Sequence, residues 1–468
     1  MENTYELIVI GAGPGGYSAA VRASQLGLRT AIVERENLGG ICLNWGCIPT
    51  KALLKSAEAY TYLQHASLYG LTAPGEIPAP HLPAIVQRSR DIASQMSRGV
   101  EFLMKKNKID VFSGTARLLP GHRVAIQTDR DGEQQEISAP NIIIATGARS
   151  RELPGLPQDG THIIGYRQAL TLQQLPQTMI VVGSGAIGSE LAYFYNALGT
   201  KVTVVEYLPR ILPLEDAEVS REAERIFRKR GIKSLTGAEV LGAETTPQGT
   251  VTVTVKTAKG TQELSAEVVL SAVGISANIE QLGLEQAGIE TARGKIVTDA
   301  CCRTSQPGYY AIGDVIPTPA LAHVAAAEGI VAAETIAGRT PEPVDYGNIP
   351  GATYITPQVA SVGLTEEKAL QEGYTLRVGK FPFTASGKAR AASRAEGFVK
   401  VIFDAKTDLL LGAHMIGDNV TEMIAEAVAA RKAGMTAAQL LHTVHPHPTM
   451  SECFYEAVAA AYGEAINI

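Results

Sequence analysis

The chain has 468 residues with 41 basic and 47 acidic side chains, and this net charge of −6, without a basic run, argues against a nucleic-acid surface. Five cysteines in this length exclude the disulfide framework of a small secreted protein. No apolar run reaches the roughly 18 residues of a membrane span. A strand begins almost at the first residue, so we expect no signal peptide, and the thiol usage predicts a cytoplasmic location.

A glycine-rich turn near the start of the chain is flanked by a strand, a helix and a second strand, which we expect at Glu6–Ile10, Gly15–Leu26 and Arg29–Val33. The turn fits G-x-G-x-x-G with Gly11, Gly13 and Gly16, and Glu34 follows Gly11 by 23 residues. Glycines in this context let the backbone approach a pyrophosphate at a helix N-terminus, and the acid accepts a hydrogen bond from a ribose hydroxyl. The pattern therefore predicts a dinucleotide site.

Cys42 and Cys47 come directly after this unit, in the segment Gly39–Lys51. Thiols spaced C-x4-C can form a disulfide, bind a metal or pack in a core. A closed metal site needs about four N or S ligands, and no second pair or nearby histidine cluster supplies them. A reversible disulfide is favoured over a metal, while a structural cystine or two buried thiols remain open at this point.

The geometry of a disulfide constrains the backbone between the two cysteines. A regular helix would hold their Cα atoms about 8.6 Å apart, whereas a disulfide needs roughly 4.4–6.8 Å. We therefore expect a departure from ideal helix, which Gly46 and Pro49 favour. Residues 50–59 predict a helix, so Cys47 would lie by its positive end with Lys51 close in sequence, and both features favour a thiolate.

The same dinucleotide unit recurs 172 residues later without a gap. Its strand is expected at Met179–Val182, its glycines are Gly183, Gly185 and Gly188, and its acid is Glu206, again 23 residues after the first glycine. Two such units with the same interval predict that the chain binds two dinucleotides.

The acids indicate which dinucleotides these are. A carboxylate at Glu206 suits an unphosphorylated ribose and repels a 2′-phosphate, so the second unit favours NAD over NADP. Arg210 is a weak counter-signal that is more often surface charge. The first unit runs into the cysteine segment, so its ligand must meet the disulfide; a flavin fits, because it exchanges electrons with both thiols and nicotinamide.

Further strands organise the rest of the chain. The segment Asn141–Ala148 predicts a buried strand and turn, Val268–Gly274 repeats this arrangement, and Tyr309–Asp314 predicts a strand with an acid at its carboxyl end. That acid, Asp314, suits a polyol hydroxyl or, equally, a helix cap. A helix is expected behind it at about Leu321–Ala337.

These elements predict an α/β protein with two Rossmann-like FAD- and NAD(P)-binding domains and a C-terminal α+β dimerisation domain. We expect residues 1–150 and 275–345 to form the FAD-binding domain, 151–274 the NAD-binding domain, and 346–468 the interface domain. The last domain should contain strands and helices at Val359–Leu364, Gly397–Asp404, Leu410–Ile416, Val420–Ala433 and Met450–Ala461. The other cysteines, Cys301, Cys302 and Cys453, are expected to be structural.

A second reactive cluster lies near the C-terminus, with His442, His445 and His447 separated by prolines. Glu452, five residues after His447, could orient that imidazole and raise its basicity, as a general base requires. A metal site is disfavoured because the His-Pro alternation points the rings apart. A capped helix with surface histidines is the other interpretation, but a thiol–disulfide enzyme needs a base to deprotonate an incoming dithiol.

Together these motifs resemble the dihydrolipoamide dehydrogenases, which belong to the class I pyridine nucleotide-disulfide oxidoreductases. The resemblance covers essentially the whole chain and is carried by Gly11–Gly16, Gly39–Lys51, Ala145–Gly147, Gly183–Glu190, Tyr310–Asp314 and His445–Glu452. Thr50 stands where the family often has Ser, a change that we expect to be harmless. The resemblance implies a homodimeric enzyme that oxidises protein-bound dihydrolipoamide through a redox-active disulfide and FAD and reduces NAD+. Its partners would be lipoylated domains of 2-oxo acid dehydrogenase complexes or the H-protein of glycine cleavage.

The resemblance also implies individual roles. Cys42 would be the interchange thiol and Cys47 the charge-transfer thiolate beside the flavin. His447, oriented by Glu452, would act across the dimer interface on the other subunit's disulfide, and Lys51 would contact the flavin and pair with Glu190. FAD contacts are expected at Gly11, Gly13, Gly16, Glu34, Arg35, Gly40, Ile41, Lys51, Gly114, Thr146, Gly147, Ala148, Asp314, Ala320, Leu321, Ala322 and His323. NAD contacts are expected at Gly183, Ser184, Gly185, Ala186, Ile187, Gly188, Ser189, Glu190, Glu206, Val240 and Gly274. No metal is expected.

Related functions are disfavoured by particular residues. Glutathione and trypanothione reductases prefer NADPH and normally carry basic residues after the second unit, where this chain has Glu206. Mercuric reductase needs a further cysteine pair near the C-terminus, and none follows Cys453. A non-catalytic subunit with this fold should lack Cys42, Cys47 or His447, and all three are present.

Overall fold

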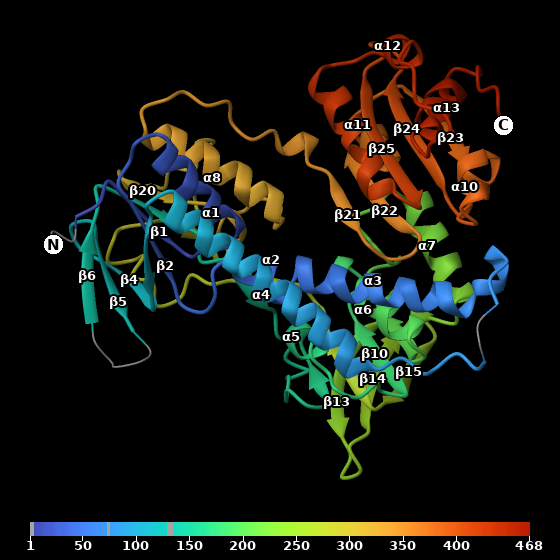
Figure 1. Ribbon diagram of the computed structural model, residues 1–468, viewed down its shortest axis with the longest axis horizontal. Coiled ribbons are helices and arrows are strands. Elements are labelled where there is room, and N and C mark those ends of the chain that lie inside the picture. The colour runs from blue at the N-terminus through green and yellow to red at the C-terminus, as the bar shows by residue number, and fades with distance from the viewer. Residues whose placement is uncertain (1–3, 73–74, 129–133) are drawn as a thin grey trace. The chain divides into compact units, whose positions relative to one another are not determined.

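The computed structural model describes residues 4–72, 75–128 and 134–468 (Figure 1). The chain forms two compact units, each assembled from segments that are distant in the sequence. The first unit comprises Met1–Ala52, Gln87–Arg151 and Ile275–Tyr346. The second comprises Leu53–Val86, Glu152–Gly274 and Gly347–Ile468.

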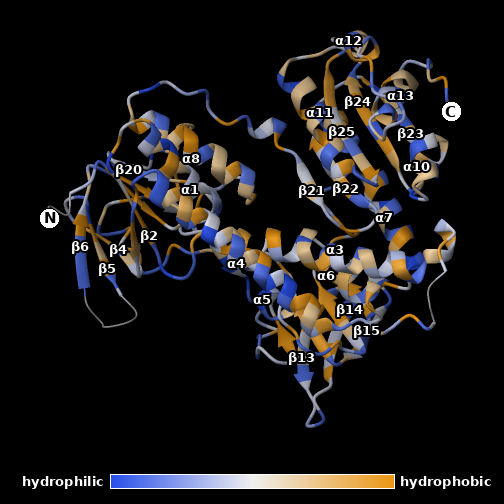
Figure 2. Ribbon diagram, viewed as in Figure 1, coloured by the Kyte–Doolittle hydropathy of each residue, from blue (hydrophilic) through white to orange (hydrophobic). Residues whose placement is uncertain are grey.

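A five-stranded parallel sheet forms the centre of the first unit, in the order β20-β7-β1-β2-β3. Its strands are β1 (Leu7–Ile10), β2 (Thr30–Glu34), β3 (Asp110–Ser113), β7 (Asn141–Ile144) and β20 (Tyr309–Ala311). All four residues of β1 are buried. A parallel sheet that is covered on both faces requires such an apolar run, and Figure 2 shows hydrophobic residues gathered in the strands.

The helices of this unit are α1 (Pro14–Gln25), α2 (Gly40–Trp45), the start of α3 (Cys47–Gln64), most of α4 (Leu82–Lys106), the 3₁₀ turn η2 (Gly313–Val315) and α8 (Ala322–Ile336). Helices α1 and α8 lie side by side (Figure 1). Their close approach depends on small residues, because a Cβ on Gly329 would lie 2.5 Å from the carbonyl oxygen of Gly15. The packing therefore places the start of α1 against α8.

In its described residues, the first unit also contains three small antiparallel sheets. They are β4–β5–β6 (Thr115–Leu119, Arg123–Gln127, Gln134–Ser138), β8–β17 (Ala148–Ser150, Ile275–Ala277) and β18–β19 (Thr291–Ala292, Lys295–Ile296). Strand β8 lies just before the chain leaves this unit at Arg151, and β17 begins where it returns at Ile275. They pair with each other, so the exit and the return are joined by backbone hydrogen bonds.

The second unit contains another five-stranded parallel sheet, in the order β12-β11-β10-β16-β9. Its strands are β9 (Ile163–Ile164), β10 (Thr178–Val182), β11 (Lys201–Val205), β12 (Lys233–Leu235) and β16 (Val268–Ser271). The accompanying elements are α5 (Tyr166–Ala169), α6 (Ala186–Ala197), α7 (Ala217–Lys229) and the antiparallel sheet β13–β14–β15 (Glu239–Thr245, Val251–Thr257, Gly260–Ala266). The turn η1 (Ala66–Tyr69) follows α3.

The C-terminal part of the second unit is built on an antiparallel sheet in the order β21-β22-β25-β24-β23. Its elements are the end of η3 (Tyr346–Asn348), β21 (Gly351–Thr353), β22 (Gln358–Gly363), α9 (Glu366–Gln371), β23 (Leu376–Pro382), η4 (Phe383–Ala385), α10 (Gly387–Ala391), β24 (Phe398–Asp404), β25 (Leu410–Gly417), α11 (Val420–Lys432), α12 (Ala437–Leu441) and α13 (Glu452–Ala461). One face of the sheet, including Val399 and Met415, packs in an apolar core with α11 and α13. The other face carries Lys400 directly opposite His414.

The predicted elements agree with these bounds within a few residues. For the strand–helix–strand of the first unit, most of the observed ends differ from the predicted ends by one residue. The last helix starts at Glu452 rather than at Met450, and in the turn before it the Glu452 carboxylate accepts a hydrogen bond from Thr449 N at 2.7 Å.

Within the described residues, no helix has both the length and the apolar character that crossing a membrane requires.

Candidate active site

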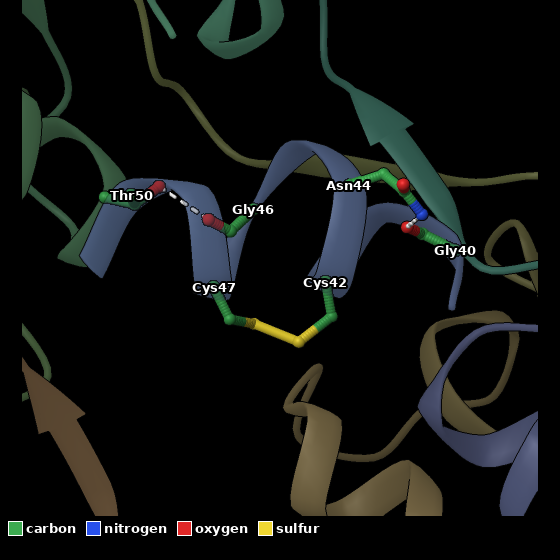
Figure 3. The surroundings of a disulfide bond; sticks show 6 residues. All are labelled: Gly40, Cys42, Asn44, Gly46, Cys47 and Thr50. Carbon is green, nitrogen blue, oxygen red and sulfur yellow. Dashed lines mark hydrogen bonds between the residues drawn. A yellow bond between two sulfur atoms is a disulfide. The ribbon is translucent and has the colours of Figure 1, made fainter. Parts of the chain in front are cut away.

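Cys42 and Cys47 form a disulfide with their Cα atoms 4.8 Å apart. This separation is possible because the helix breaks between them: α2 ends at Trp45, Gly46 has φ −141° and ψ −110°, and α3 starts at Cys47. Both side chains leave the helices on the same side (Figure 3). The predicted departure from ideal helix is confirmed, and Cys47 lies at the positive N-terminus of an 18-residue helix.

The disulfide segment rests directly on the first glycine turn. Gly39 N donates to Ala12 O at 2.8 Å, and a Cβ on Gly40 would lie 2.7 Å from Gly13 Cα. Both Gly39 and Gly40 have positive φ (93° and 58°), which other residues adopt only with strain. These glycines therefore bring the start of α2 as close to the turn as the backbone allows.

Hydrogen bonds of polar side chains also hold the same segment. Asn44 donates through Nδ2 to Gly40 O and Leu38 O, and its Oδ1 accepts from Ser97 of α4 at 2.8 Å. Thr50 Oγ1 donates to Gly46 O at 2.6 Å, which ties the first turn of α3 to the break (Figure 3). The disulfide segment is thus held by the glycine turn, by Ser97 and by its own Asn44 and Thr50 side chains.

The two glycine turns have the same geometry. A Cβ on Gly11 would meet Ala145 O at 2.2 Å, and one on Gly183 would meet Ala272 O at 2.4 Å. The third glycines repeat this agreement, since Cβ atoms on Gly16 and Gly188 would lie 1.8 and 2.0 Å from carbonyl oxygens of their own turns. The first and third glycines are therefore required by the packing of the protein itself.

The middle glycine of each turn has no such requirement. A Cβ on Gly13 or Gly185 would meet no heavy atom of the described chain within 4 Å, sequence neighbours aside. Their φ angles, −67° and −64°, suit any residue. A glycine that packing does not demand, at a helix N-terminus, fits close approach by a pyrophosphate. The residues present therefore fit a dinucleotide in each turn.

The acid of each unit accepts the same pair of backbone hydrogen bonds. Glu34 accepts from Ala12 N at 2.8 Å and from Glu36 N at 2.9 Å. Glu206 accepts from Ser184 N and from Leu208 N, both at 2.8 Å. Each carboxylate is thus oriented beside its glycine turn by two backbone N–H groups, and the predicted repeat extends to individual hydrogen bonds.

The turn after β7 is locked by a residue that the sequence analysis missed. Asn278 N donates to Gly147 O at 2.9 Å, its Nδ2 donates to Thr146 O at 3.0 Å, and its carbonyl oxygen accepts from Thr146 Oγ1 at 2.6 Å. Asn278 directly follows β17, and pairing of β17 with β8 brings it to the turn. Thr146 and Gly147, expected to contact FAD, are therefore held from the return strand.

Asp314 lies in η2, just after β20, as predicted. Burial raises the pKa of its carboxyl, although the nearby charge of Lys295 opposes the shift. The missed residue here is Glu328 of α8, which is fully buried, accepts from Gly313 N at 2.6 Å and from Tyr346 Oη at 2.9 Å. Burial raises the pKa of Glu328, despite these bonds. An acid on a helix behind a strand end was the only available signal.

The remaining predicted nucleotide contacts of the first unit lie around the same sheet edge. Gly114 N donates to Glu34 O at 2.9 Å, Ile41 is in α2, Ala148 opens β8, Arg35 is exposed just after β2, and Ala320–His323 lead into α8.

In the second unit, residues 186–190 form the start of α6, Val240 lies in β13 and Gly274, with φ 110°, follows β16. Lys51 belongs to the first unit and Glu190 to the second, so their pairing stays a prediction.

His447 and Glu452 are brought together as predicted. His447 Nδ1 lies 2.8 Å from Glu452 Oε1, while the imidazole is 80% exposed. Burial opposes ionisation of Glu452, but hydrogen bonds from Thr449 N and His447 outweigh it and lower the pKa of the carboxyl. A carboxylate that is ionised and fixed in this way orients the imidazole with Nε2 directed away from it, which suits a general base.

Of the other histidines and cysteines, three have contacts or surroundings that bear on the predictions. His445 Nε2 lies 2.6 Å from Glu426 Oε1 of α11, a pair that sequence spacing did not indicate. Among the residues that the structure describes, no group of three His, Cys, Asp or Glu side chains could hold a metal ion. Cys302 and Cys453 are buried, and burial raises the pKa of the Cys453 thiol to about 11, which agrees with a structural role.

The pyridine nucleotide-disulphide oxidoreductase family matches residues 5–329, and the dimerisation domain of the pyridine nucleotide-disulphide oxidoreductases matches residues 349–458. The chain belongs to the pyridine nucleotide-disulphide oxidoreductase family. The fold class predicted from the sequence is therefore confirmed, including a C-terminal dimerisation domain.

Curated oxidoreductases of this family are similar to the chain over its full length. Dihydrolipoyl dehydrogenase of Rhizobium etli is 50% identical over 482 residues, and that of Zymomonas mobilis is 48% identical over 470, each alignment covering all of both chains. The Bacillus subtilis dihydrolipoyl dehydrogenase is 44% identical, again with complete coverage. The resemblance stated from the motifs is confirmed by these relatives.

Solved structures of this family agree with the fold. LpdA from Mycobacterium tuberculosis has a TM-score of 0.89 and 29% identity, covering 97% of this chain and 98% of its own. The HOCl-induced flavoprotein disulfide reductase RclA from Escherichia coli, as its Cu(II) complex, has a TM-score of 0.87 and 26% identity, covering 97% and 99%. The chain thus shares its architecture with flavoprotein reductases over nearly its whole length.

Proposed function

We propose that this oxidoreductase is a dihydrolipoyl dehydrogenase, which oxidises protein-bound dihydrolipoamide and reduces NAD+. The observation that carries the proposal is the seating of the Cys42–Cys47 disulfide on the first glycine turn, through Gly39 N–Ala12 O and the close contact of Gly40 with Gly13. A redox-active thiol pair built onto a dinucleotide cradle suits electron exchange with the ligand of that cradle. The names of the full-length relatives support the choice of substrate.

Each glycine turn together with its acid forms what we call a cradle: Gly11–Gly16 with Glu34 is the first, and Gly183–Gly188 with Glu206 is the second. We assign the first cradle to FAD and the second to NAD. FAD, when bound, supplies two-electron transfer between a dithiol and nicotinamide. The residues proposed to hold it include Gly13, Glu34, Thr146 and Asp314, which line the carboxyl edge of the first sheet. Glu206 suits the unphosphorylated ribose of NAD, since two backbone N–H groups fix its negative charge beside the second turn.

The thiol half of the reaction uses the chain's own residues. A thiolate of dihydrolipoamide attacks Cys42 Sγ, the Cys42–Cys47 bond breaks, and Cys47 leaves as a thiolate at the N-terminus of α3, where the helix dipole stabilises it. The second substrate thiol then attacks the mixed disulfide, which forms the lipoamide disulfide and releases Cys42 as a thiol. The pair Cys42/Cys47 thereby gains the two electrons that the substrate loses.

His447 is the proposed base for this exchange. Its Nδ1 is occupied by Glu452, so Nε2 can accept the proton of the substrate thiol, and the ionised Glu452 stabilises the resulting imidazolium. The side chain is exposed in the isolated chain. We propose that it serves the disulfide of the second subunit in a homodimer.

The predicted domains follow the same assignment. We propose that residues 1–150 and 275–345 bind FAD, 151–274 bind NAD, and 346–468 form the dimer interface, with lipoylated domains of 2-oxo acid dehydrogenase or glycine cleavage complexes as partners. A cytoplasmic location stays a prediction from the thiol content.

A steady-state assay with free dihydrolipoamide tests the proposal. Purified, flavin-loaded protein should reduce NAD+ far faster than NADP+ and lose this activity when dihydrolipoamide is omitted. Activity with glutathione disulfide and NADPH that exceeds activity with dihydrolipoamide and NAD+ would contradict it. So would protein that binds no flavin under any refolding or loading condition.

A further inference from the structure

One positively charged side chain lies on the loop beside the second cradle. The residues between Glu206 and Asp216 include a single basic side chain, Arg210. Residues on either side of Arg210 are bonded to Ser184: Glu206 accepts from Ser184 N and Oγ at 2.8 and 2.6 Å, and Leu212 N donates to Ser184 O at 3.2 Å. The loop therefore closes around the glycine turn, and Arg210 lies on the segment that borders the proposed adenosine ribose.

A basic residue in this position would ordinarily favour NADP. A 2′-phosphate is bound by arginine near the end of the second strand of a dinucleotide unit, whereas a carboxylate there selects an unphosphorylated ribose. Glu206 supplies the carboxylate and Arg210 the opposite preference on one loop. The coenzyme preference therefore depends on where the Arg210 guanidinium is directed.

In the structure, the Arg210 guanidinium is directed to the C-terminal part of the same compact unit. Arg210 Nη1 and Nη2 donate to the two carboxylate oxygens of Glu367 in α9, at 2.9 and 2.7 Å. A two-bond fork of this kind fixes the plane of the guanidinium as well as its position. The ion pair raises the pKa of Arg210 and lowers that of Glu367, in agreement with the contact.

We propose that Glu367 determines coenzyme specificity from outside the dinucleotide domain, by engaging Arg210 and so withholding the loop's single cation from a 2′-phosphate. The inference rests on the proposed function in one respect, the assignment of NAD to the second cradle. The side chains of Arg210 and Glu367 are 31% and 51% exposed. Solvent therefore reaches the pair, and breaking it leaves a charged guanidinium free to move without burying an unpaired charge.

The test is Glu367→Gln, which keeps the shape of the side chain and removes its charge. Binding of 2′,5′-ADP and of AMP is measured by titration calorimetry, and kcat/KM is measured for NADP+ and NAD+. We expect the ratio of affinities, 2′,5′-ADP over AMP, and the ratio of kcat/KM, NADP+ over NAD+, each to rise about fivefold, the effect of one partly screened charge. AMP binding and melting temperature should stay at parent values.

Two further variants keep the result interpretable. Glu372→Gln removes an exposed carboxylate at the end of the same helix and should leave both ratios unchanged. The double variant Arg210→Met, Glu367→Gln should return both ratios to the parent values, because the gain requires the freed guanidinium. A ratio that does not rise in Glu367→Gln, or a rise that persists in the double variant, would overturn the inference.

The nucleotide titrations separate this inference from the proposed function. A chain that binds AMP but does not oxidise dihydrolipoamide would contradict the proposed substrate and still allow the Glu367 test to succeed or fail. A chain that binds neither AMP nor 2′,5′-ADP would overturn both. Parent protein that prefers 2′,5′-ADP would overturn the inference, since Arg210 would then already serve a 2′-phosphate, and would also contradict the assignment of NAD to the second cradle. Parent protein that prefers AMP, with no rise of either ratio in Glu367→Gln, would overturn the inference alone.

Discussion

The two dinucleotide units of this chain are nearly identical in their cradles and different in the segments that extend from them. Gly11 and Gly183 have φ values of 101° and 97°, and Glu34 and Glu206 accept equivalent backbone hydrogen bonds. The cradle itself therefore does not decide which ligand a unit serves. The chemistry of each unit must come from the segment attached to it.

The first unit continues into the two helices that the disulfide joins, and the second unit continues into a loop with charged side chains. After Glu34 the chain enters α2 and the Cys42–Cys47 disulfide, seated on the first turn. After Glu206 the chain forms a loop that ends at Asp216, which is the N-cap of α7. The Asp216 carboxylate pairs with the buried Lys400. One extension brings redox chemistry to its cradle, and the other anchors its cradle to the C-terminal sheet. Substitutions confined to one extension or one cradle should therefore have separable effects.

The largest effect is expected from the disulfide. Cys47→Ser should lower dihydrolipoamide oxidation by at least about 10³-fold, because it removes the leaving thiolate of the exchange. Oxidation of NADH by an artificial electron acceptor should persist, since that reaction does not use the thiols. Cys301→Ser is the matched control and should retain both activities. Comparable residual dithiol activity in the two variants would contradict the role of Cys47.

The next effect concerns the base. His447→Gln should slow dihydrolipoamide oxidation by about 10²–10⁴-fold, the usual contribution of a general base. NADH oxidation by the artificial acceptor should again be spared. Both rates are measured on the flavin-loaded protein, with His442→Gln as the control because His442 lies close in sequence, at the end of α12. Equal loss of both activities would show that His447 stabilises the fold or the dimer instead.

The sequence predicted those residues that act through local spacing. The glycine turns, the helix break at Gly46 and the His447–Glu452 pair all join residues within about one or two turns of chain, where backbone geometry alone limits the outcome. The sequence did not indicate Asn278 or Lys400. Asn278 meets Thr146 across 132 residues, and Lys400 meets Asp216 across 184. Such partners are chosen by tertiary packing, which no local pattern encodes.

The anchor of the second extension should carry a large part of the stability. Lys400 is 1% exposed and its Nζ lies 3.0 Å from Asp216, 3.1 Å from Glu218 and 2.5 Å from Glu366. Lys400→Met should lower the free energy of unfolding by about 3–5 kcal/mol, because Asp216 is left buried without a cation. Urea unfolding at pH 7 measures this value. Lys388→Met, at an exposed position of α10, is the control and should change it by less than about 0.5 kcal/mol.

The pH dependence of this deficit has a definite sign. Burial alone would raise the pKa of Asp216, but Lys400 outweighs burial and lowers it, so the pair stabilises the fold above pH ~4 and loses this contribution as pH falls through the folded-state pKa. Without Lys400, burial is opposed by weaker effects, mainly the hydrogen bond from Glu218 N and the charge of His414, so the pKa of Asp216 should rise. The deficit of Lys400→Met should therefore grow as pH rises above ~4. A deficit that stays constant between about pH 4 and pH 7 would show that Asp216 is not the affected group.

The last prediction compares substitutions of two glycines within one cradle. Gly185→Ala adds a Cβ that meets no other part of the described chain, so the melting temperature should stay near that of the parent while NAD+ affinity falls about tenfold, or about 1.4 kcal/mol. Gly188→Ala adds a Cβ 2.0 Å from Gly183 O and should instead destabilise the fold by about 3 kcal/mol. The same contrast between Gly13→Ala and Gly16→Ala should affect flavin retention rather than NAD+ binding. If Gly185→Ala kept full NAD+ affinity, the second turn would not approach the pyrophosphate, and its glycine would need another explanation.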